Sequence, residues 1–355
     1  MVDIVEIRPE SRVDWNAFVE NHPFGWLYHR SEWCEVLVGS FRHMKPRYLA
    51  LIESETDSIR AALPLFEVNS WLTSRRLVSV PFATLFDPLV SDAEELKVLL
   101  DAAVRLSAER RCRYLEIRTM QSDGYAADGR LARTETFRFH NIELDTEPDK
   151  LKKSFHRSCV RQRIDRALKS DIEVQWPDGE ESLKTFYWLF QRTRSRIGLP
   201  TQPWRYFLTM WHRFFPLNQI ALVCAVRDSQ LLAGLLLLVW KDRVSAEFYA
   251  WDDRYVSLSP GHLLFWESIN WAYERGYRNF DFGRTSRVNH GLIDFKRRWR
   301  TTESSLPIYY YPASYGEAHT DEMSSATYKV ASMLCRKTPA VFQKNLGNFF
   351  YRHLG

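Results

Sequence analysis

The order of predicted elements repeats along this chain of 355 residues, and no other feature constrains its fold as strongly. Each half contains an opening strand, two helices, three strands separated by turn residues, one longer helix and a closing strand. A repeat of about eight elements in the same order indicates an internal duplication. We therefore expect two similar α/β units in tandem rather than one continuous, doubly wound parallel sheet.

The closing helix and strand of the two halves also resemble one another in sequence. Residues 109–117 read ERRCRYLEI, and residues 274–282 read ERGYRNFDF. Junctions of this kind occur in many α/β chains, so this likeness by itself leaves chance open. The second half adds an expected helix at residues 151–169, and its turns make the three middle strands an antiparallel meander.

The domain organisation follows from the repeat. We expect a first unit at residues 1–134, a second unit at residues 135–315, and an amphipathic helical tail at residues 316–355. The join between the units is expected near residues 130–138. Each unit should hold a mixed, mostly antiparallel sheet flanked by helices, an α/β (α+β) fold.

The composition is that of a folded protein, with 45% hydrophobic, 26% charged and 14% aromatic residues. A net charge of +5 is compatible with an anionic ligand such as a nucleotide, a tRNA or a membrane surface, but does not require one. The five cysteines are scattered, without a Cys-x-x-Cys pair or a Cys/His cluster. We therefore expect neither a metal site nor a disulfide framework.

Two segments bear on the location of the protein. The longest apolar run, at residues 231–240, has about half of the length that a membrane helix needs, so we expect a strand buried on both faces. The first twelve residues lack an apolar core flanked by basic residues, so no signal peptide is expected. These features predict a cytoplasmic protein.

The first candidate site is the loop that joins the strand ending in Tyr249-Ala250-Trp251 to a helix opened by Ser259, Pro260 and Gly261. Pro suits the first turn of a helix, and Gly261 allows close approach of a ligand to the backbone. The free N–H groups of this helix start, which includes His262, can bind a phosphate or a developing oxyanion. The alternative is an ordinary helix start in which Ser259 is the N-cap.

The second candidate is Asp281-Phe282-Gly283-Arg284 at the end of the closing strand, with Lys296 further along the chain. Asp281 is a candidate general base or amine-binding group, and the alternative is a structural ion pair with Arg284. Lys296 lies among several arginines, so a solvated cationic face is its alternative. Phe295 and Trp299 beside it indicate instead that this segment packs against the body of the protein.

The third candidate is the basic segment at residues 150–166. Lys153, Arg157 and Arg161 recur every four residues and would share one face of a continuous helix. An anionic ligand would offset the repulsion between them. The alternative is a solvated amphipathic helix.

These motifs together resemble the FemAB-like branch of the GNAT acyltransferase superfamily over about residues 140–311. The residues that carry the likeness are Arg157, Arg161 and Arg163 with Ala167-Leu168-Lys169, Thr193-x-x-Arg196-x-Gly198-Leu199-Pro200, Tyr249-x-Trp251-Asp252, Leu258-x-Pro260, Asp281-Phe282-Gly283-Arg284 and Gly291-Leu292-x-x-Phe295-Lys296-x-x-Trp299. The branch that this set resembles most accompanies bacterial exopolysaccharide export and protein-sorting systems. Fem transferases attach amino acids from aminoacyl-tRNA to peptidoglycan precursors.

The resemblance implies two GNAT units, with donor and acceptor meeting in the second unit where adjacent strands splay apart. It implies that Lys296 stabilises the charge that develops at the reacting carbonyl. The sequence departs from the family pattern in two places. Arg300 follows Trp299 where the family usually has Gly, and the donor loop lacks the Gly-rich phosphate signature of CoA-binding GNAT enzymes. Both departures leave the donor open between acyl-CoA and aminoacyl-tRNA.

These observations predict an N-acyltransferase that moves an acyl or aminoacyl group to an amine of an envelope precursor or polysaccharide. Asp281 would hold or deprotonate the amine, and Tyr249 would protonate the leaving group. Backbone N–H groups near Trp251 and at residues 259–262 would bind the donor and polarise its carbonyl. Arg157, Arg161 and Arg284 would bind substrate.

A second hypothesis is a non-catalytic RNA- or polysaccharide-binding module on the same fold, because basic and aromatic residues can bind phosphates and stack on bases or sugars. The amphipathic tail would either rest on a membrane surface or pack on its own domain. The sequence leaves the oligomeric state open.

Overall fold

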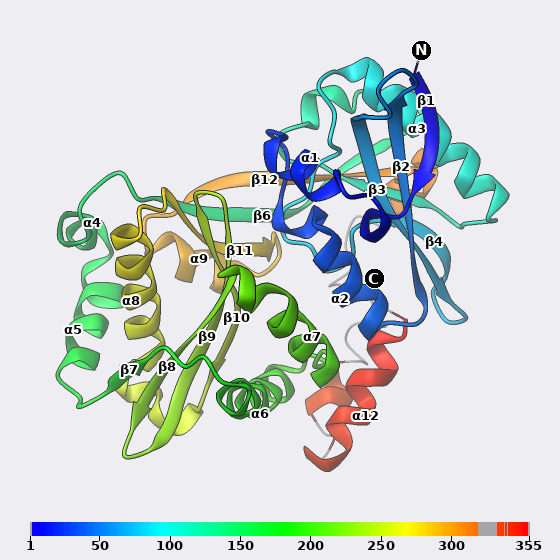
Figure 1. Cartoon of the computed structure of the whole chain (residues 1–355). Helices are drawn as coiled ribbons and strands as arrows, with labels where there is room; N and C mark the ends of the chain where they lie inside the picture. The colour runs from blue at the N-terminus through cyan, green and yellow to red at the C-terminus, as the bar shows by residue number, and fades with distance from the viewer. Residues whose placement is uncertain (1, 319–331, 337, 339, 354–355) are drawn as a thin grey trace. The chain divides into compact units, whose positions relative to one another are not determined.

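The computed structural model describes residues 2–318, 332–336, 338 and 340–353. They form two compact units (Figure 1). The first contains residues 2–137, the segment from residue 305 to 318, and residues 347–353. The second contains residues 138–304 and the described part of the tail up to residue 346. The strands β6 (Ala132–Glu143) and β12 (Thr302–Tyr311) contribute residues to both units.

The first unit is built on strands in the order β1-β2-β3-β4-β5-β12. Neighbours pair antiparallel except β4 and β5, which are parallel. Its elements are β1 (Val2–Ile7), α1 (Trp15–Asn21), α2 (Ser31–Ser40), β2 (Met44–Glu53), β3 (Ile59–Ser70), β4 (Ser74–Ser79), α3 (Ala93–Glu109) and β5 (Leu115–Arg118). The apolar face of α3 packs on β2, β3 and β5 and closes one hydrophobic core.

The second unit is built on strands in the order β6-β11-β10-β9-β8-β7. Its remaining elements are α4 (Pro148–Ser154), α5 (Gln162–Leu168), β7 (Glu173–Gln175), α6 (Glu180–Ile197), α7 (Trp204–Phe214), β8 (Ile220–Arg227), β9 (Gln230–Trp240), β10 (Arg243–Trp251), α8 (Pro260–Glu274), β11 (Asn279–Ser286) and α9 (His290–Arg297). Helix α6 covers one face of β9 and β10, and α8 covers the other, with α5 packed on α8 (Figure 1). Because both faces are covered, β9 is buried along nearly its whole length, as its apolar run predicted.

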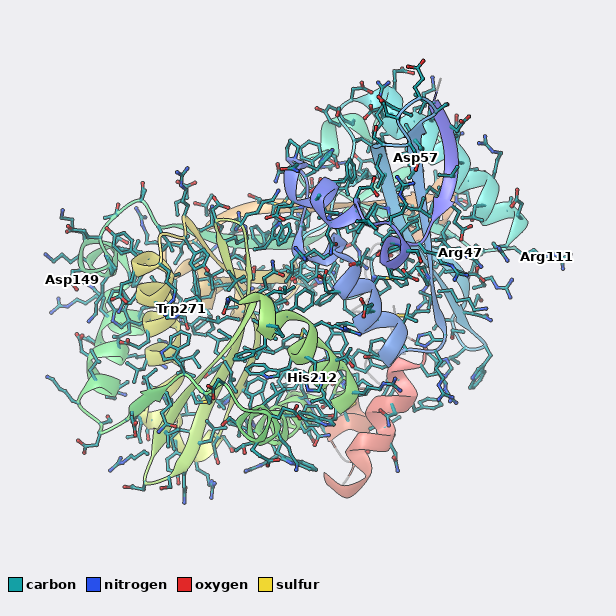
Figure 2. All side chains as sticks on the ribbon, in the orientation of Figure 1. Arg47, Asp57, Arg111, Asp149, His212 and Trp271 are labelled. Carbon is teal, nitrogen blue, oxygen red and sulfur yellow. The ribbon has the colours of Figure 1, made fainter. Side chains whose placement is uncertain are left out.

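Side chains fill the space between helices and sheet in both units (Figure 2). The core of the second unit is rich in aromatic rings, including Phe265, Phe282 and Trp299. The sequence predicted mixed, mostly antiparallel sheets, and the predicted antiparallel meander of the second half is present as β8, β9 and β10.

The duplication is visible in backbone geometry at the junctions that the sequence comparison singled out. Arg111 and Gly276 occupy matching positions after α3 and α8, and both have positive φ angles, 53° and 78°. In each junction the next N–H donates to a carbonyl five residues earlier, from Cys112 to Ser107 at 2.9 Å and from Tyr277 to Ala272 at 3.1 Å. The two halves therefore end their long helices with the same capping turn.

The unit boundaries differ from the predicted ones in more than one place: residues 135–137 belong to the first unit, and the described residues of the predicted tail are divided between the two units. Residues 305–315 were expected in the second unit, but β12 carries the chain back to the first. From Ile308 to Tyr311 it pairs with β5. The pairing of β12 joins residues that are far apart in sequence, and a pattern read along the chain does not show it.

The predicted continuous helix at residues 151–169 is wrong. Helix α4 ends at Ser154, a π-helix follows at Arg157–Arg161, and α5 begins at Gln162. The break occurs because Phe155 turns inward and is buried against Trp299, with ring centroids 5.3 Å apart. The N–H of His156 then donates to the Arg298 carbonyl at 2.9 Å.

The described part of the tail packs on the protein. The Ser195 hydroxyl of α6 donates to the carbonyl of Cys335, at 3.2 Å, and Tyr351 and His353 are buried in the first unit. Residues 319–331, 337, 339 and 354–355 of the predicted tail lie outside the described residues. Among the helices described, including α10 (Ala313–Ala318) and α12 (Ala340–Tyr351), none has the length and apolar character needed to cross a bilayer.

Candidate functional site

The strands β10 and β11 separate in the middle of the second unit. They pair in parallel only from Arg243 opposite Asn279 to Ser245 opposite Asp281. Immediately beyond this pairing, the register of β10 against β9 shifts between Ala246 and Phe248, which leaves a bulge at Glu247. The bulge turns β10 away, and the sheet opens between the two strands.

Lys296 of α9 enters this opening. Its side chain is 4% exposed, and its ammonium donates to the carbonyls of Gly283 and Arg284, at 2.9 and 3.3 Å. Burial lowers the pKa of Lys296 to about 7, although the negative charges of Asp281 and Glu247 act to raise it. An ammonium has three N–H donors, so one remains for a ligand after the two carbonyls are bound. The alternative of a solvated cationic face is therefore wrong for Lys296.

Asp281 is fully buried at the point where the strands part. It accepts hydrogen bonds from the Ser245 hydroxyl at 2.6 Å and from the Gly283 N–H at 2.9 Å. Its ion-pair partner is Arg243 of β10 at 3.7 Å, not Arg284 as the sequence suggested. Parallel pairing brings Arg243 beside Asp281, whereas the Arg284 carbonyl is bound to Lys296. Burial raises the pKa of Asp281, and the Arg243 charge opposes this.

Tyr249 lies against the first turn of α8. A Cβ added at Gly261 would be 1.9 Å from the Tyr249 hydroxyl oxygen, so glycine is required there by a side chain of the same unit. The ring stacks on Trp251, with centroids 5.2 Å apart. Burial raises the pKa of Tyr249 above its ordinary value, which keeps the hydroxyl protonated and able to donate.

Ser259 stands at the N-cap position of α8 but does not cap the helix with its side chain. Its backbone is left-handed, with φ 60° and ψ 39°, and its side chain makes no capping hydrogen bond. The residue is 4% exposed, and its hydroxyl oxygen is buried without a hydrogen-bond partner. An unpaired buried hydroxyl at a helix start is costly, so the part of the alternative in which the Ser259 side chain caps the helix is wrong.

His262 follows in the first turn of α8 and stacks on Trp299, with ring centroids 5.8 Å apart. Burial lowers the pKa of His262 to about 4, and repulsion from Arg163 adds to the effect. The imidazole is therefore neutral near pH 7. Arg300, which follows Trp299, has a φ of 61°. This left-handed conformation explains on physical grounds why Gly suits the position.

The backbone around Trp251 is already hydrogen-bonded. The Trp251 N–H donates to the hydroxyl of Thr193 at 3.0 Å, and the same hydroxyl donates to the Trp251 carbonyl at 3.1 Å. Arg196 also donates to that carbonyl and lies over the Trp251 ring at 4.8 Å. The N–H of Trp251 itself is therefore occupied in this conformation, and the expectation that backbone N–H groups near Trp251 polarise the donor carbonyl stays a prediction for its neighbours. The Thr193-x-x-Arg196 motif instead holds the end of β10.

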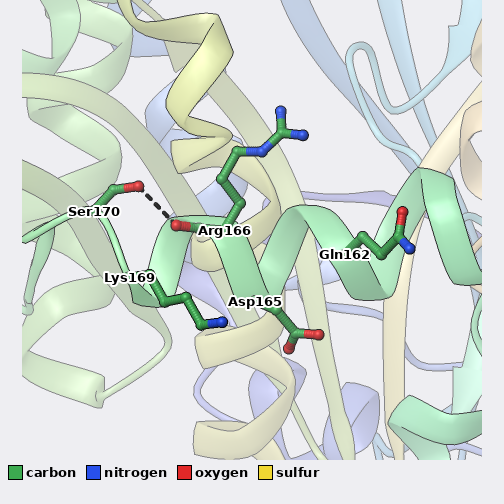
Figure 3. Close-up of a pocket in the computed structure, with 5 residues that line it drawn as sticks. All are labelled: Gln162, Asp165, Arg166, Lys169 and Ser170. Carbon is green, nitrogen blue, oxygen red and sulfur yellow. Dashed lines mark hydrogen bonds between the residues drawn. The ribbon is translucent and has the colours of Figure 1, made fainter.

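The basic residues do not form one helical face, because the helix breaks between α4 and the π-helix. Lys153 and Arg157 are exposed, while Arg161 is half-buried and its Nε atom is buried without a hydrogen-bond partner. An open surface hollow is lined by residues of the following α5 and of the two positions after it: Gln162, Asp165, Arg166, Lys169 and Ser170 (Figure 3). Arg166 reaches from it to the Ser257 carbonyl at 3.3 Å, two residues before Ser259.

Several residues of this region were missed in the sequence. Arg243, Ser245 and Glu247 alternate with Val244 and Ala246 along β10, a polar and apolar alternation that marks one side of the strand. His140 of β6 is fully buried, and burial together with the charge of Lys296 lowers its pKa to about 4. No sequence motif marked His140. Within the described residues, no group of three or more His, Cys, Asp or Glu side chains could hold a metal ion.

A family model described as the acetyltransferase (GNAT) domain matches residues 154–297. This match covers most of the second unit. The match includes the π-helix, the opening between β10 and β11, and Lys296. No curated protein shows significant sequence similarity to the chain.

Solved structures extend the comparison to the whole fold. FemX has a TM-score of 0.69 at 17% identity, covering 90% of this chain and 100% of its own. A tandem GNAT protein from the clavulanic acid biosynthesis pathway has a TM-score of 0.56 at 11% identity, with 88% and 99% covered. The C-terminal domain of a putative lysylphosphatidylglycerol synthetase from Agrobacterium fabrum has a TM-score of 0.54 at 14% identity, with 86% and 91% covered. The fold of two GNAT-like units and the FemAB-like resemblance are confirmed.

Proposed function

We propose that the second unit transfers an acyl or aminoacyl group from an activated donor, an acyl-CoA or an aminoacyl-tRNA, to an amine of a cell-envelope precursor or polysaccharide. The observation that carries the proposal is the buried Lys296 in the opening between β10 and β11 of a GNAT domain. In the reaction, the amine nitrogen attacks the carbonyl carbon, a C–N bond forms, and the C–S or C–O bond of the donor breaks. The amine loses a proton, and the leaving thiol or hydroxyl gains one.

Lys296 is proposed to stabilise the oxyanion of this reaction. Its pKa of about 7 means that the free site holds a mixture of amine and ammonium at neutral pH. A negative charge that develops nearby favours the ammonium. The interaction is then stronger in the transition state than in the ground state, which is the condition for catalysis.

Asp281 is proposed as a positioning residue, a narrower role than the predicted contact with the amine. Its two oxygens are occupied by Ser245, Gly283 and Arg243, and it has no exposed surface. It fixes the backbone of β11 at Gly283, whose carbonyl accepts a hydrogen bond from Lys296. Tyr249 remains the proposed donor of a proton to the leaving group, because its hydroxyl is protonated and lies beside the start of α8.

The donor is proposed to bind at residues 259–262, with Trp251 beside them. The buried and unpaired hydroxyl of Ser259 supports this, since a bound oxygen or N–H group would satisfy it. Arg157, Arg161 and Arg284 are proposed to contact anionic parts of the substrates. The proposal of a cell-envelope acceptor is supported by the similarity of the fold to that of FemX and of a putative lysylphosphatidylglycerol synthetase.

The donor proposal is tested by thermal unfolding against a panel of CoA thioesters and aminoacyl-tRNAs, followed by hydrogen exchange. A donor at about one hundred times its Kd should stabilise the fold by about 2.7 kcal/mol and protect the amides of residues 259–264 and 282–286. Protection elsewhere, or no stabilisation by any donor, would contradict the proposed site. Binding at the site without transfer to any amine would favour the non-catalytic module.

A further inference from the structure

The turn between β3 and β4 in the first unit exposes large apolar side chains. Pairing of the two strands ends at Ser70 opposite Ser74, and the turn between them carries Trp71 and Leu72, which are 77% and 53% exposed. Phe349 of α12 is 45% exposed, and its ring lies 5.1 Å from that of His353. The Trp71 ring meets the same histidine edge-on at 5.0 Å. We call Trp71, Leu72 and Phe349 the hairpin-tip patch.

The turn is held rigidly. The Ser70 hydroxyl shares a hydrogen bond of 2.9 Å with Nδ1 of the buried His353, and it accepts from the N–H groups of Leu72 and Thr73. The Thr73 hydroxyl donates to the His353 carbonyl at 2.9 Å. A tryptophan on a tip fixed in this way stays in water in the free protein, although burying it elsewhere would be favourable.

The two chain segments that carry the hairpin-tip patch contain charged residues of one sign. Neither residues 69–76 nor residues 345–353 contain an aspartate or glutamate, while each segment contains arginine. Arg352 is exposed and forms no ion pair within the described residues. Tryptophan favours the boundary between lipid headgroups and acyl chains, and arginine beside it is attracted by anionic headgroups.

We propose that the hairpin-tip patch docks the first unit on the surface of an anionic lipid bilayer. Trp71 and Leu72 enter the headgroup boundary, Phe349 lies beside them, and Arg352 faces the anionic headgroups. The contact is interfacial and involves no membrane-spanning segment. It is independent of the proposed transfer reaction, because it uses none of the residues of the second unit.

The test is co-sedimentation of the full chain with vesicles of phosphatidylcholine, and with vesicles of three parts phosphatidylcholine to one part phosphatidylglycerol. The chain should bind the anionic vesicles more tightly, and added salt should weaken the binding. The double variant Trp71→Ser, Leu72→Ser should lose most of the binding. Arg352→Gln should weaken it by about five-fold, the equivalent of about 1 kcal/mol for one basic residue near the surface.

The matched control is Trp188→Ser, because Trp188 of α6 is also highly exposed, at 58%, but belongs to the second unit. This variant should bind as the wild type does. Failure of the wild type to bind anionic vesicles, or an equal loss with Trp188→Ser, would overturn the proposal. So would self-association of the wild type in sedimentation velocity that the double variant abolishes, since the patch would then contact a second copy of the chain.

Discussion

Replacing Lys296 by methionine tests the buried lysine without any knowledge of the substrate. The side chain has similar length, and the change removes the ammonium that binds the Gly283 and Arg284 carbonyls. Each carbonyl left without a donor costs about 1–3 kcal/mol. The lowered pKa of Lys296, about 7 instead of 10.5, reduces the free energy of unfolding of the wild type by about 4 kcal/mol at pH 7. The variant lacks the buried ammonium and therefore lacks this cost. The two effects nearly cancel at pH 7.

The pH dependence separates them. The folded pKa of Lys296 lies below its unfolded value, so between these values the unfolded chain binds more protons and stability rises with pH. From pH 7 to pH 9 the wild type should gain about 2 kcal/mol from this residue, or about 4–8 °C in Tm. Lys296→Met should lack that gain, so its Tm should fall behind the wild type as the pH rises.

The assay is thermal unfolding from pH 6 to pH 10, with Lys184→Met as the control because the Lys184 side chain is 52% exposed. Groups that do not interact with Lys296 shift both proteins equally and do not affect the difference between them. His140, whose pKa of about 4 the Lys296 charge helps to lower, titrates below this pH range. Parallel Tm curves for the wild type and Lys296→Met would refute the reasoning, because they would show that Lys296 titrates normally in the folded protein.

Three further predictions follow from the geometry. Arg300→Gly should raise the free energy of unfolding by about 1 kcal/mol in urea titration, because φ is 61° at this position; an unchanged midpoint would show that the backbone there is unstrained. Gly261→Ala should destabilise the fold by about 1–3 kcal/mol through its clash with Tyr249, and adding Tyr249→Ala should restore part of the loss; strict additivity of the two changes would contradict the contact. Because the pKa of His140 is about 4 in the folded protein, the free energy of unfolding should fall by up to about 3 kcal/mol as the pH falls from 6.5 to 4. In an acid-unfolding titration, His140→Gln should show a smaller fall over this pH range.

The repeat of elements could be read from the sequence because hydrophobic periodicity is local. The strands of the meander and the likeness of the junctions at residues 109–117 and 274–282 needed no knowledge of distant contacts. The pairing of β12 with β5 does need it, and the sequence assigned that segment to the wrong unit.

The candidate site shows the same limit. The motifs led to Lys296 and Asp281, but the partner of Asp281 was sought at the nearby Arg284, whereas strand pairing supplies Arg243 from β10. The four-residue spacing of the basic residues predicted one helix, and the inward turn of Phe155 interrupts it. In both cases a tertiary contact overrides a pattern that is correct locally.

The most direct test of the proposed function compares the turnover of the wild type and Lys296→Met with a donor that stabilises the protein, at saturating donor and acceptor amine. Loss of one oxyanion donor costs about two to three orders of magnitude in kcat. We expect a fall of that size for Lys296→Met, with the Kd of the donor changed by no more than about two-fold, because Lys296 acts mainly on the transition state. Equal turnover by the two proteins would contradict the proposed role of the opening between β10 and β11.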